Sequence, residues 1–129
     1  MSNPQVFISY SKSDTDWARS FADALKQRGV RVWFDEFQIA AGEPLREALE
    51  TGLRESDVFV ALFDPQSSLR PNFLFELGAA IGMGKRVVPI VPREADTSKL
   101  PVELRVRRYL VKDSPEDTAQ ELAHALVTA

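Results

Sequence analysis

Glu76 is the residue whose type and position in this sequence best suit it to chemistry. At 100° per residue, the apolar side chains around it gather on one arc of a predicted helix that begins near Pro71 and ends at Gly84. Asn72 lies one turn before Glu76, and both fall at the margin of that arc. If a buried strand leads into this helix, the Glu76 carboxylate should point toward a ligand crevice. The alternative, which position alone leaves open, is an ordinary glutamate stabilised by the helix dipole.

Serine hydroxyls and a lysine ammonium group are concentrated in the segment Ser9-Tyr10-Ser11-Lys12-Ser13, after the first predicted strand. Together with the start of a helix, such groups form a plausible cradle for an anion. The segment contains no glycine, so it is neither a dinucleotide fingerprint nor a phosphate loop.

The sequence lacks the residues that several other kinds of site require. The chain has 0 Cys, which excludes disulfides, a thiolate nucleophile and cysteine-ligated zinc or iron–sulfur sites. Its single histidine, His124, cannot build a histidine-rich metal centre, and on an amphipathic C-terminal helix it is expected at the surface. We therefore predict no metal and no serine–histidine–aspartate triad.

Asp64 and Lys112 match two positions of the receiver domains of response regulators, which need an aspartate after strand three and a lysine after strand five. Those domains also need an acidic pair after strand one to bind Mg²⁺, and here strand one ends in Ser9, Tyr10 and Ser11. The receiver interpretation is therefore disfavoured, and Asp64 followed by proline also suits a plain turn.

Short runs rich in branched and aromatic side chains predict five strands, at residues 5–10, 30–34, 57–63, 86–91 and 107–111. Helical spacing between them predicts a helix capped by Ser13, with Asp16 at its third position and Gly29 as its stop. Further helices should begin at Pro44, near Pro71 and at Pro115, because proline suits the first helical position.

Strands that alternate with helices predict a doubly wound α/β fold with a parallel sheet, in the flavodoxin-like order 2-1-3-4-5. The runs 58–63 and 87–91 are almost continuously apolar, as strands covered on both faces must be. Pro89 should cause a bulge or an interrupted bond. In such sheets ligands bind beyond the carboxyl ends of the strands, where the strand order reverses.

Length and composition agree with a single small globular domain. The 129 residues suit one domain, 1–129, and the net charge of −3 with scattered basic residues argues against nucleic acid as a ligand. No apolar run approaches the roughly 20 residues of a membrane span, and residues 1–10 lack the pattern of a signal peptide. We expect a cytoplasmic domain without membrane partners, and excision from a longer protein is left open.

Three sequence boxes together resemble those of the TIR domain. The first is Val6-Phe7-Ile8-Ser9-Tyr10-Ser11 with Asp14 and Trp17, the second is Val32-Trp33-Phe34-Asp35 ending in Gly42 at the BB loop, and the third is Ser56-Asp57-Val58-Phe59-Val60-Ala61-Leu62. The resemblance covers nearly the whole chain with the order of elements intact. It implies the flavodoxin-like fold predicted above.

The resemblance also implies an activity, because enzymatic TIR domains use a glutamate on the helix after strand three to cleave the nicotinamide–ribose bond of NAD⁺. The matching residue is Glu76. Tyr10 and Ser11 would lie beside the nicotinamide ribose, and Asp35 and Gly42 would frame the BB loop. Many members carry tryptophan where this chain has Asn72, and the run 72–78 is also similar to nucleoside deoxyribosyltransferases.

This chemistry needs little else from the protein. Nicotinamide is already a cationic leaving group, so one carboxylate near the ribosyl carbon can stabilise an oxocarbenium-like transition state. NAD⁺ is then the substrate, no cofactor is required, and the product is linear or cyclic ADP-ribose. Bacterial relatives of this kind resemble antiphage effectors that deplete NAD⁺. The alternatives are a non-catalytic TIR scaffold and a deoxyribosyltransferase-like enzyme.

Homotypic contacts are a second expectation. Phe37 and Ile39 lie in the apolar stretch 35–42, which has little to bury it within one domain and would then form a partner surface. The alternative is that both side chains fold back on the second helix. Phe75, Gly78 and Gly82 share the outer arc of the third helix, where a lone domain should show charge to water. This apolar arc predicts assembly into oligomers or filaments, unless the segment 92–106 covers it.

Overall fold

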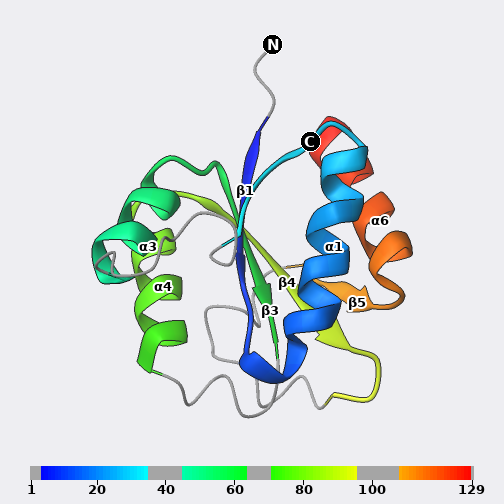
Figure 1. Cartoon of the computed structure of the whole chain (residues 1–129), viewed down its shortest axis with the longest axis horizontal. Coiled ribbons are helices and arrows are strands. Elements are labelled where there is room, and N and C mark those ends of the chain that lie inside the picture. Colours follow the sequence, from blue (N-terminus) through cyan, green and yellow to red (C-terminus); the bar gives the residue numbers. More distant parts are fainter. Residues whose placement is uncertain (1–3, 35–44, 64–70, 96–107, 129) are drawn as a thin grey trace.

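The computed structural model describes residues 4–34, 45–63, 71–95 and 108–128. At its centre is one sheet of five parallel strands in the order β2-β1-β3-β4-β5. The strands are β1 (Gln5–Ser9), β2 (Arg31–Trp33), β3 (Val58–Leu62), β4 (Arg86–Pro92) and β5 (Leu110–Lys112). The predicted doubly wound class and strand order are both confirmed (Figure 1).

Helices cover both faces of this sheet. They are the short 3-10 turn η1 (Lys12–Asp14), α1 (Thr15–Gln27), α3 (Leu45–Arg54), α4 (Pro71–Gly82) and α6 (Pro115–Thr128). Figure 1 shows α1 and α6 on one face and α3 and α4 on the other. Alternate residues of β1 serve the two layers, because Val6 and Ile8 pack in a core with α1 and α6 whereas Phe7 packs in a core with α3 and α4. We call these the α1/α6 core and the α3/α4 core.

The helix ends follow the predicted glycine and proline signals at most positions. Gly29 and Gly84 have φ of 80° and 73°, values that favour glycine. After α1, the N–H of Gly29 donates to the carbonyl of Lys26 and that of Val30 donates to Leu25, and Gly84 ends α4 with the same pair of bonds. Helix α4 begins at Pro71 and α6 at Pro115, as predicted, whereas Pro44 lies outside the described residues.

The start of α1 differs from the prediction. Asp14, not Ser13, occupies the N-cap, and no side-chain hydrogen bond caps the helix there. Ser13 lies within η1, and its Oγ is 3.0 Å from the Oγ of Ser11. The Asp14 carboxylate is held by Lys112 at 2.9 Å. The Asp14 carboxylate therefore has a tertiary partner instead of the first helical N–H groups.

Pro89 causes no bulge in β4. The register with β3 runs unbroken from Val58 opposite Arg86 to Leu62 opposite Ile90. Successive residues of a strand direct their backbone polar groups to alternate sides, and the Ile90 carbonyl accepts the N–H of Phe63 on the β3 side. Pro89 therefore turns its missing donor toward β5, and pairing with β5 begins one residue later, at Ile90 opposite Leu110.

Strand β5 is shorter than predicted and starts later. It spans Leu110–Lys112 instead of 107–111, and Arg108 and Tyr109 are exposed coil residues. Extending the register backward sets Tyr109 opposite Pro89, which has no N–H for the Arg108 carbonyl. The β-type composition of this run was thus overridden by the neighbouring proline.

The α3/α4 core contains a stack of aromatic rings that constrains α3. Trp33 lies on Phe7 with ring centroids 4.8 Å apart and an interplanar angle of 6°, and Phe7 in turn stacks on Phe59. Gly52 of α3 packs against the indole so closely that an added Cβ would overlap the ring of Trp33. A glycine in this helix is therefore required by packing, despite its cost of up to about 1 kcal/mol relative to alanine.

We expect Gly52→Ala to lower the free energy of unfolding by about 1 to 3 kcal/mol, because the overlap outweighs the gain in helix propensity. Urea denaturation followed by far-UV circular dichroism measures the change. Gly78→Ala in α4 is the matched control, since Gly78 is exposed and an added Cβ would meet no atom within 4 Å. Equal or greater stability of Gly52→Ala would contradict the packing argument.

Candidate active site

Glu76 lies in the second turn of α4, and its side chain is buried, with 8% exposed. Its Oε1 accepts a hydrogen bond of 2.7 Å from the Oγ of Ser9. Ser9 is the last residue of β1 and is 3% exposed. The carboxylate is therefore held at the carboxyl end of β1, at the edge of the sheet where the ligand crevice was predicted.

Strand alternation explains why Ser9 meets Glu76. Side chains of a strand alternate between faces, and Phe7 faces the α3/α4 core. Ser9, two residues later, faces the same layer and reaches the helix that carries Glu76. In the sequence, Ser9 is one of several hydroxyls in a row, and it is not among the predicted site residues. A polar side chain at the end of an otherwise buried strand, on the face of Phe7, was the signal that could have found it.

Tyr10 lies on the opposite side of the sheet from α4. Its ring stacks on Phe34 with centroids 4.9 Å apart and an interplanar angle of 8°. It also packs, partly buried, against the α1/α6 core. The structure thus brings Ser9 to Glu76 and directs the ring of Tyr10 toward the other layer. A contact between Tyr10 and substrate stays a prediction.

A second polar cluster occupies the same edge of the sheet, on the α1 side. Ser11 is 6% exposed, and its Oγ donates to Asp14 Oδ2 at 3.3 Å. Lys112, the last residue of β5, donates to the other oxygen of Asp14 at 2.9 Å, and its ammonium lies 5.4 Å from the ring centroid of Trp17. Lys112, which resembled a receiver-domain lysine in the sequence, here ties β5 to the start of α1, while Asp64 lies outside the described residues.

The remaining predicted site residues are placed in part. Asp35, Phe37, Ile39 and Gly42 lie outside the described residues. Asn72 and Phe75 belong to α4, but their side chains are not described.

Two glycines of the predicted interface are described. Gly78 and Gly82 lie exposed on α4, and an added Cβ at either would meet no atom within 4 Å. Within the described ranges, no group of three or more metal-binding side chains could hold an ion. No helix in that part of the chain is long and apolar enough to cross a bilayer.

Comparison with known proteins places this site in context. Residues 6–127 match the family model described as "TIR domain". The 2′ cyclic ADP-D-ribose synthase AbTIR of Acinetobacter baumannii is 26% identical over 126 residues, covering 94% of this chain and 47% of that protein. The NAD(+) hydrolase TcpA of a Theionarchaea archaeon is 40% identical over 52 residues, covering 40% of this chain and 16% of that protein. The chain spans less than half the length of both.

A solved structure shares the fold over the whole domain. The TIR domain of the Toll-related receptor TRR-2 from Hydra magnipapillata superposes with a TM-score of 0.74 at 18% identity. The match covers 95% of this chain and 94% of that one.

Tyr10 gives a testable consequence of this geometry. We expect Tyr10→Ala to lower the free energy of unfolding by about 2 kcal/mol, because the ring stacks on the buried Phe34, whereas Tyr10→Phe, which keeps the ring, should cost less. Chemical denaturation of both variants measures this. Wild-type stability of Tyr10→Ala would show that the stack contributes nothing.

Proposed function

We propose that this chain, which belongs to the TIR domain family, cleaves the bond between nicotinamide and ribose in NAD⁺, with Glu76 as the catalytic carboxylate. The observation that carries the proposal is the buried carboxylate of Glu76, oriented by Ser9 at the carboxyl edge of β1. The relatives named as an NAD(+) hydrolase and a 2′ cyclic ADP-D-ribose synthase support the same chemistry.

The reaction breaks the C1′–N bond, and its electron pair returns to the pyridine ring, so nicotinamide leaves as a neutral molecule. Positive charge develops on the ribose, and a nearby carboxylate stabilises it most strongly where water is largely excluded. Glu76 meets this requirement, since only 8% of it is exposed. Water then forms the new bond at C1′ and releases a proton, giving linear ADP-ribose, or a hydroxyl of the same molecule does so and gives a cyclic product.

Ser9 acts in this scheme as a positioning residue. A carboxylate at the wrong angle or distance loses much of its effect on the transition state, and the 2.7 Å bond from Ser9 Oγ restricts Glu76 to one orientation. Tyr10, Ser11, Asp35, Gly42 and Asn72 remain our proposed substrate contacts, on the basis of the family resemblance. The biological role we infer from the same resemblance is depletion of NAD⁺ as an antiphage or cell-suicide effector.

Glu76→Gln should reduce NAD⁺ cleavage by at least about 100-fold, because the amide keeps the size of the side chain but removes the charge that the transition state needs. Nicotinamide release, resolved by chromatography at equal protein concentration, is the measurement. Glu55→Gln is the matched control, because Glu55 is an exposed glutamate between α3 and the amino end of β3, away from Glu76, and it should retain full activity.

Ser9→Ala separates charge from orientation, because it keeps the carboxylate and removes its hydrogen bond. We expect an intermediate loss of about tenfold in kcat with the fold retained. Wild-type turnover of Glu76→Gln would refute the catalytic assignment. If the wild-type protein releases no nicotinamide at any concentration, the scaffold function is favoured instead.

We also propose that homotypic contacts through α4 and the BB loop activate the domain. Gly78 and Gly82 are exposed one turn apart on α4, and their lack of side chains leaves a shallow strip on the helix surface. Phe75 precedes Gly78 by three residues, the spacing of neighbours on one helix face, and Met83 is 40% exposed. Small residues beside a large apolar one allow close approach of a second element. Phe37 and Ile39 are the proposed contribution of the BB loop to the same assembly.

Specific activity should therefore rise with protein concentration, and Phe75→Asp should give a folded monomer with little activity. Light scattering and nicotinamide release across a range of concentrations measure the two properties together. Ser20→Asp, on the exposed side of α1, adds the same single negative charge and should retain the concentration dependence. Concentration-independent activity together with a fully active Phe75→Asp monomer would exclude activation by assembly.

A further inference from the structure

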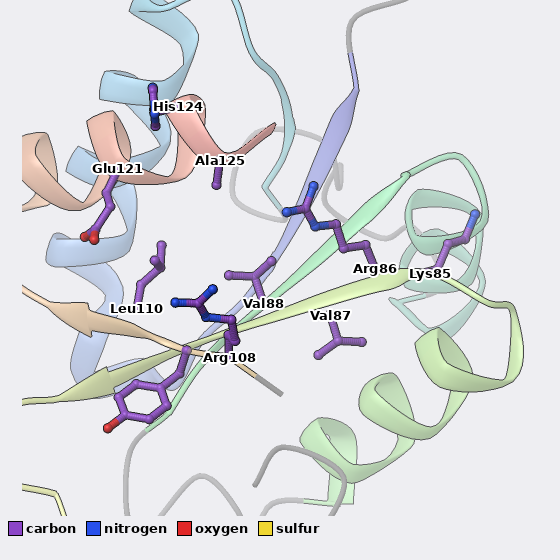
Figure 2. A pocket seen from close by; sticks show the side chains of 10 residues that line it. Lys85, Arg86, Val87, Val88, Arg108, Leu110, Glu121, His124 and Ala125 are labelled. Atoms are coloured by element: carbon purple, nitrogen blue, oxygen red, sulfur yellow. The ribbon is translucent and has the colours of Figure 1, made fainter. Parts of the chain in front are cut away.

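A pocket of about 700 Å³ lies at the other end of the sheet from Glu76. It is bounded by the first half of β4, by the residues that lead into β5, and by the last turns of α6 (Figure 2). Glu76 sits at the carboxyl ends of the strands, whereas Arg86 and Val87, which line this pocket, begin β4. The pocket therefore does not belong to the proposed catalytic site.

The pocket exists because β5 does not run along the whole of β4. Pairing starts only at Ile90 opposite Leu110, after Pro89, so the first half of β4 has no strand on its β5 side among the described residues. Backbone N–H and C=O groups of successive strand residues point to alternate sides, so those of Val87 point toward the β5 side, as does the Pro89 carbonyl. Helix α6 forms another wall of the pocket through Glu121, His124 and Ala125.

Two guanidinium groups face this space with no partner among the described residues. Figure 2 shows the side chains of Arg86 and Arg108 extending from the sheet toward α6. In the part of the chain that the structure describes, neither side chain makes a hydrogen bond or an ion pair. Lys85 also lines the pocket, but its ammonium donates to the Arg54 carbonyl at 3.0 Å and points away. Two unpaired arginines on one pocket are notable in a chain with a net charge of −3.

The rest of the lining defines the ligand more closely. Val88 and Leu110 provide an apolar floor, and Tyr109 contributes an aromatic ring that is 45% exposed. Guanidinium groups bind phosphate through paired hydrogen bonds, and apolar and aromatic surfaces accept a planar base. Among the described lining residues, Glu121 supplies the one carboxylate, which can accept a hydrogen bond from a ribose hydroxyl.

We propose that this pocket is a nucleotide-binding site, in which Arg86 and Arg108 hold the phosphate and the apolar floor with Tyr109 receives the base. Its volume is within the roughly 300 to 1,000 Å³ of small-molecule sites. The site lies away from the reacting bond of NAD⁺, so it binds a nucleotide without cleaving it. This inference stands independently of the proposed NAD⁺ cleavage.

The probe is AMP, which lacks nicotinamide and cannot be cleaved by the proposed reaction. Titration of the ¹⁵N-labelled 129-residue protein, followed by amide chemical shifts, locates the binding. Saturable shifts are expected at 85–88, 108–110 and 121–125, the segments that line the pocket. Adenosine and inorganic phosphate should each bind at least about tenfold more weakly, because each lacks one half of the recognised group.

Arg86→Gln and Arg108→Gln should each raise the Kd for AMP by about tenfold, the equivalent of one charge-assisted hydrogen bond. Arg93→Gln is the matched control, because Arg93 is 70% exposed and pairs with Asp113 near the opposite end of β4. It should leave the Kd within about twofold. The amide spectrum of each variant shows whether its fold is retained.

Three results would overturn the proposal. They are the absence of saturable shifts in the pocket segments, shifts confined to the neighbourhood of Ser9 and Glu76, and equal weakening by Arg93→Gln and the two pocket variants. The last would indicate general attraction of an anion to surface arginines. A failure of NAD⁺ cleavage would leave these measurements unaffected.

Discussion

A parallel sheet covered on both faces obliges its central strands to bury side chains in two directions, and most features of this domain depend on that constraint. All five residues of β3 are buried, and four of the five in β1. In β1, Val6 and Ile8 enter one core and Phe7 the other. The alternation continues to the end of the strand, so the side chains of its last residues also point to opposite faces of the sheet. Ser9 is aimed at α4 and Tyr10 at the opposite layer, and the chemistry of the edge follows from that division.

The same division separates two polar clusters at the carboxyl edge. On the α4 side, a serine and a glutamate from elements 67 positions apart share a short hydrogen bond. On the α1 side, Asp14 joins Ser11 to Lys112, a residue 98 positions away. The first cluster is buried and the second partly buried. Hydrogen bonds to charged groups are stronger in such surroundings, and constrain geometry more, than at an exposed surface. The edge is thus preorganised on both sides of β1, which suits a reaction that depends on placing one carboxylate.

Pro89 has an effect that extends beyond its own strand. It leaves the pairing of β3 with β4 intact, because its missing donor points the other way, but it delays pairing with β5. The resulting space beside β4 is lined by arginines that no protein group neutralises in the described part of the chain. One residue without an N–H thereby shortens a strand and opens a pocket at the end of the sheet remote from Glu76.

Local signals in the sequence determined the fold class, the helix stops at Gly29 and Gly84 and the starts at Pro71 and Pro115, because each depends on periodicity or on the backbone preference of one residue. The strand order followed less directly, from the fit of five alternating strands and helices to the flavodoxin-like topology. Local signals also placed Glu76 at the margin of a buried helix face. The tertiary structure alone decided that Ser9 would be its partner, that Lys112 would draw Asp14 away from capping α1 and that β5 would begin at Leu110. Those outcomes depend on contacts between elements far apart in the chain. Strand register and packing decide these contacts, and no local sequence pattern contains that information.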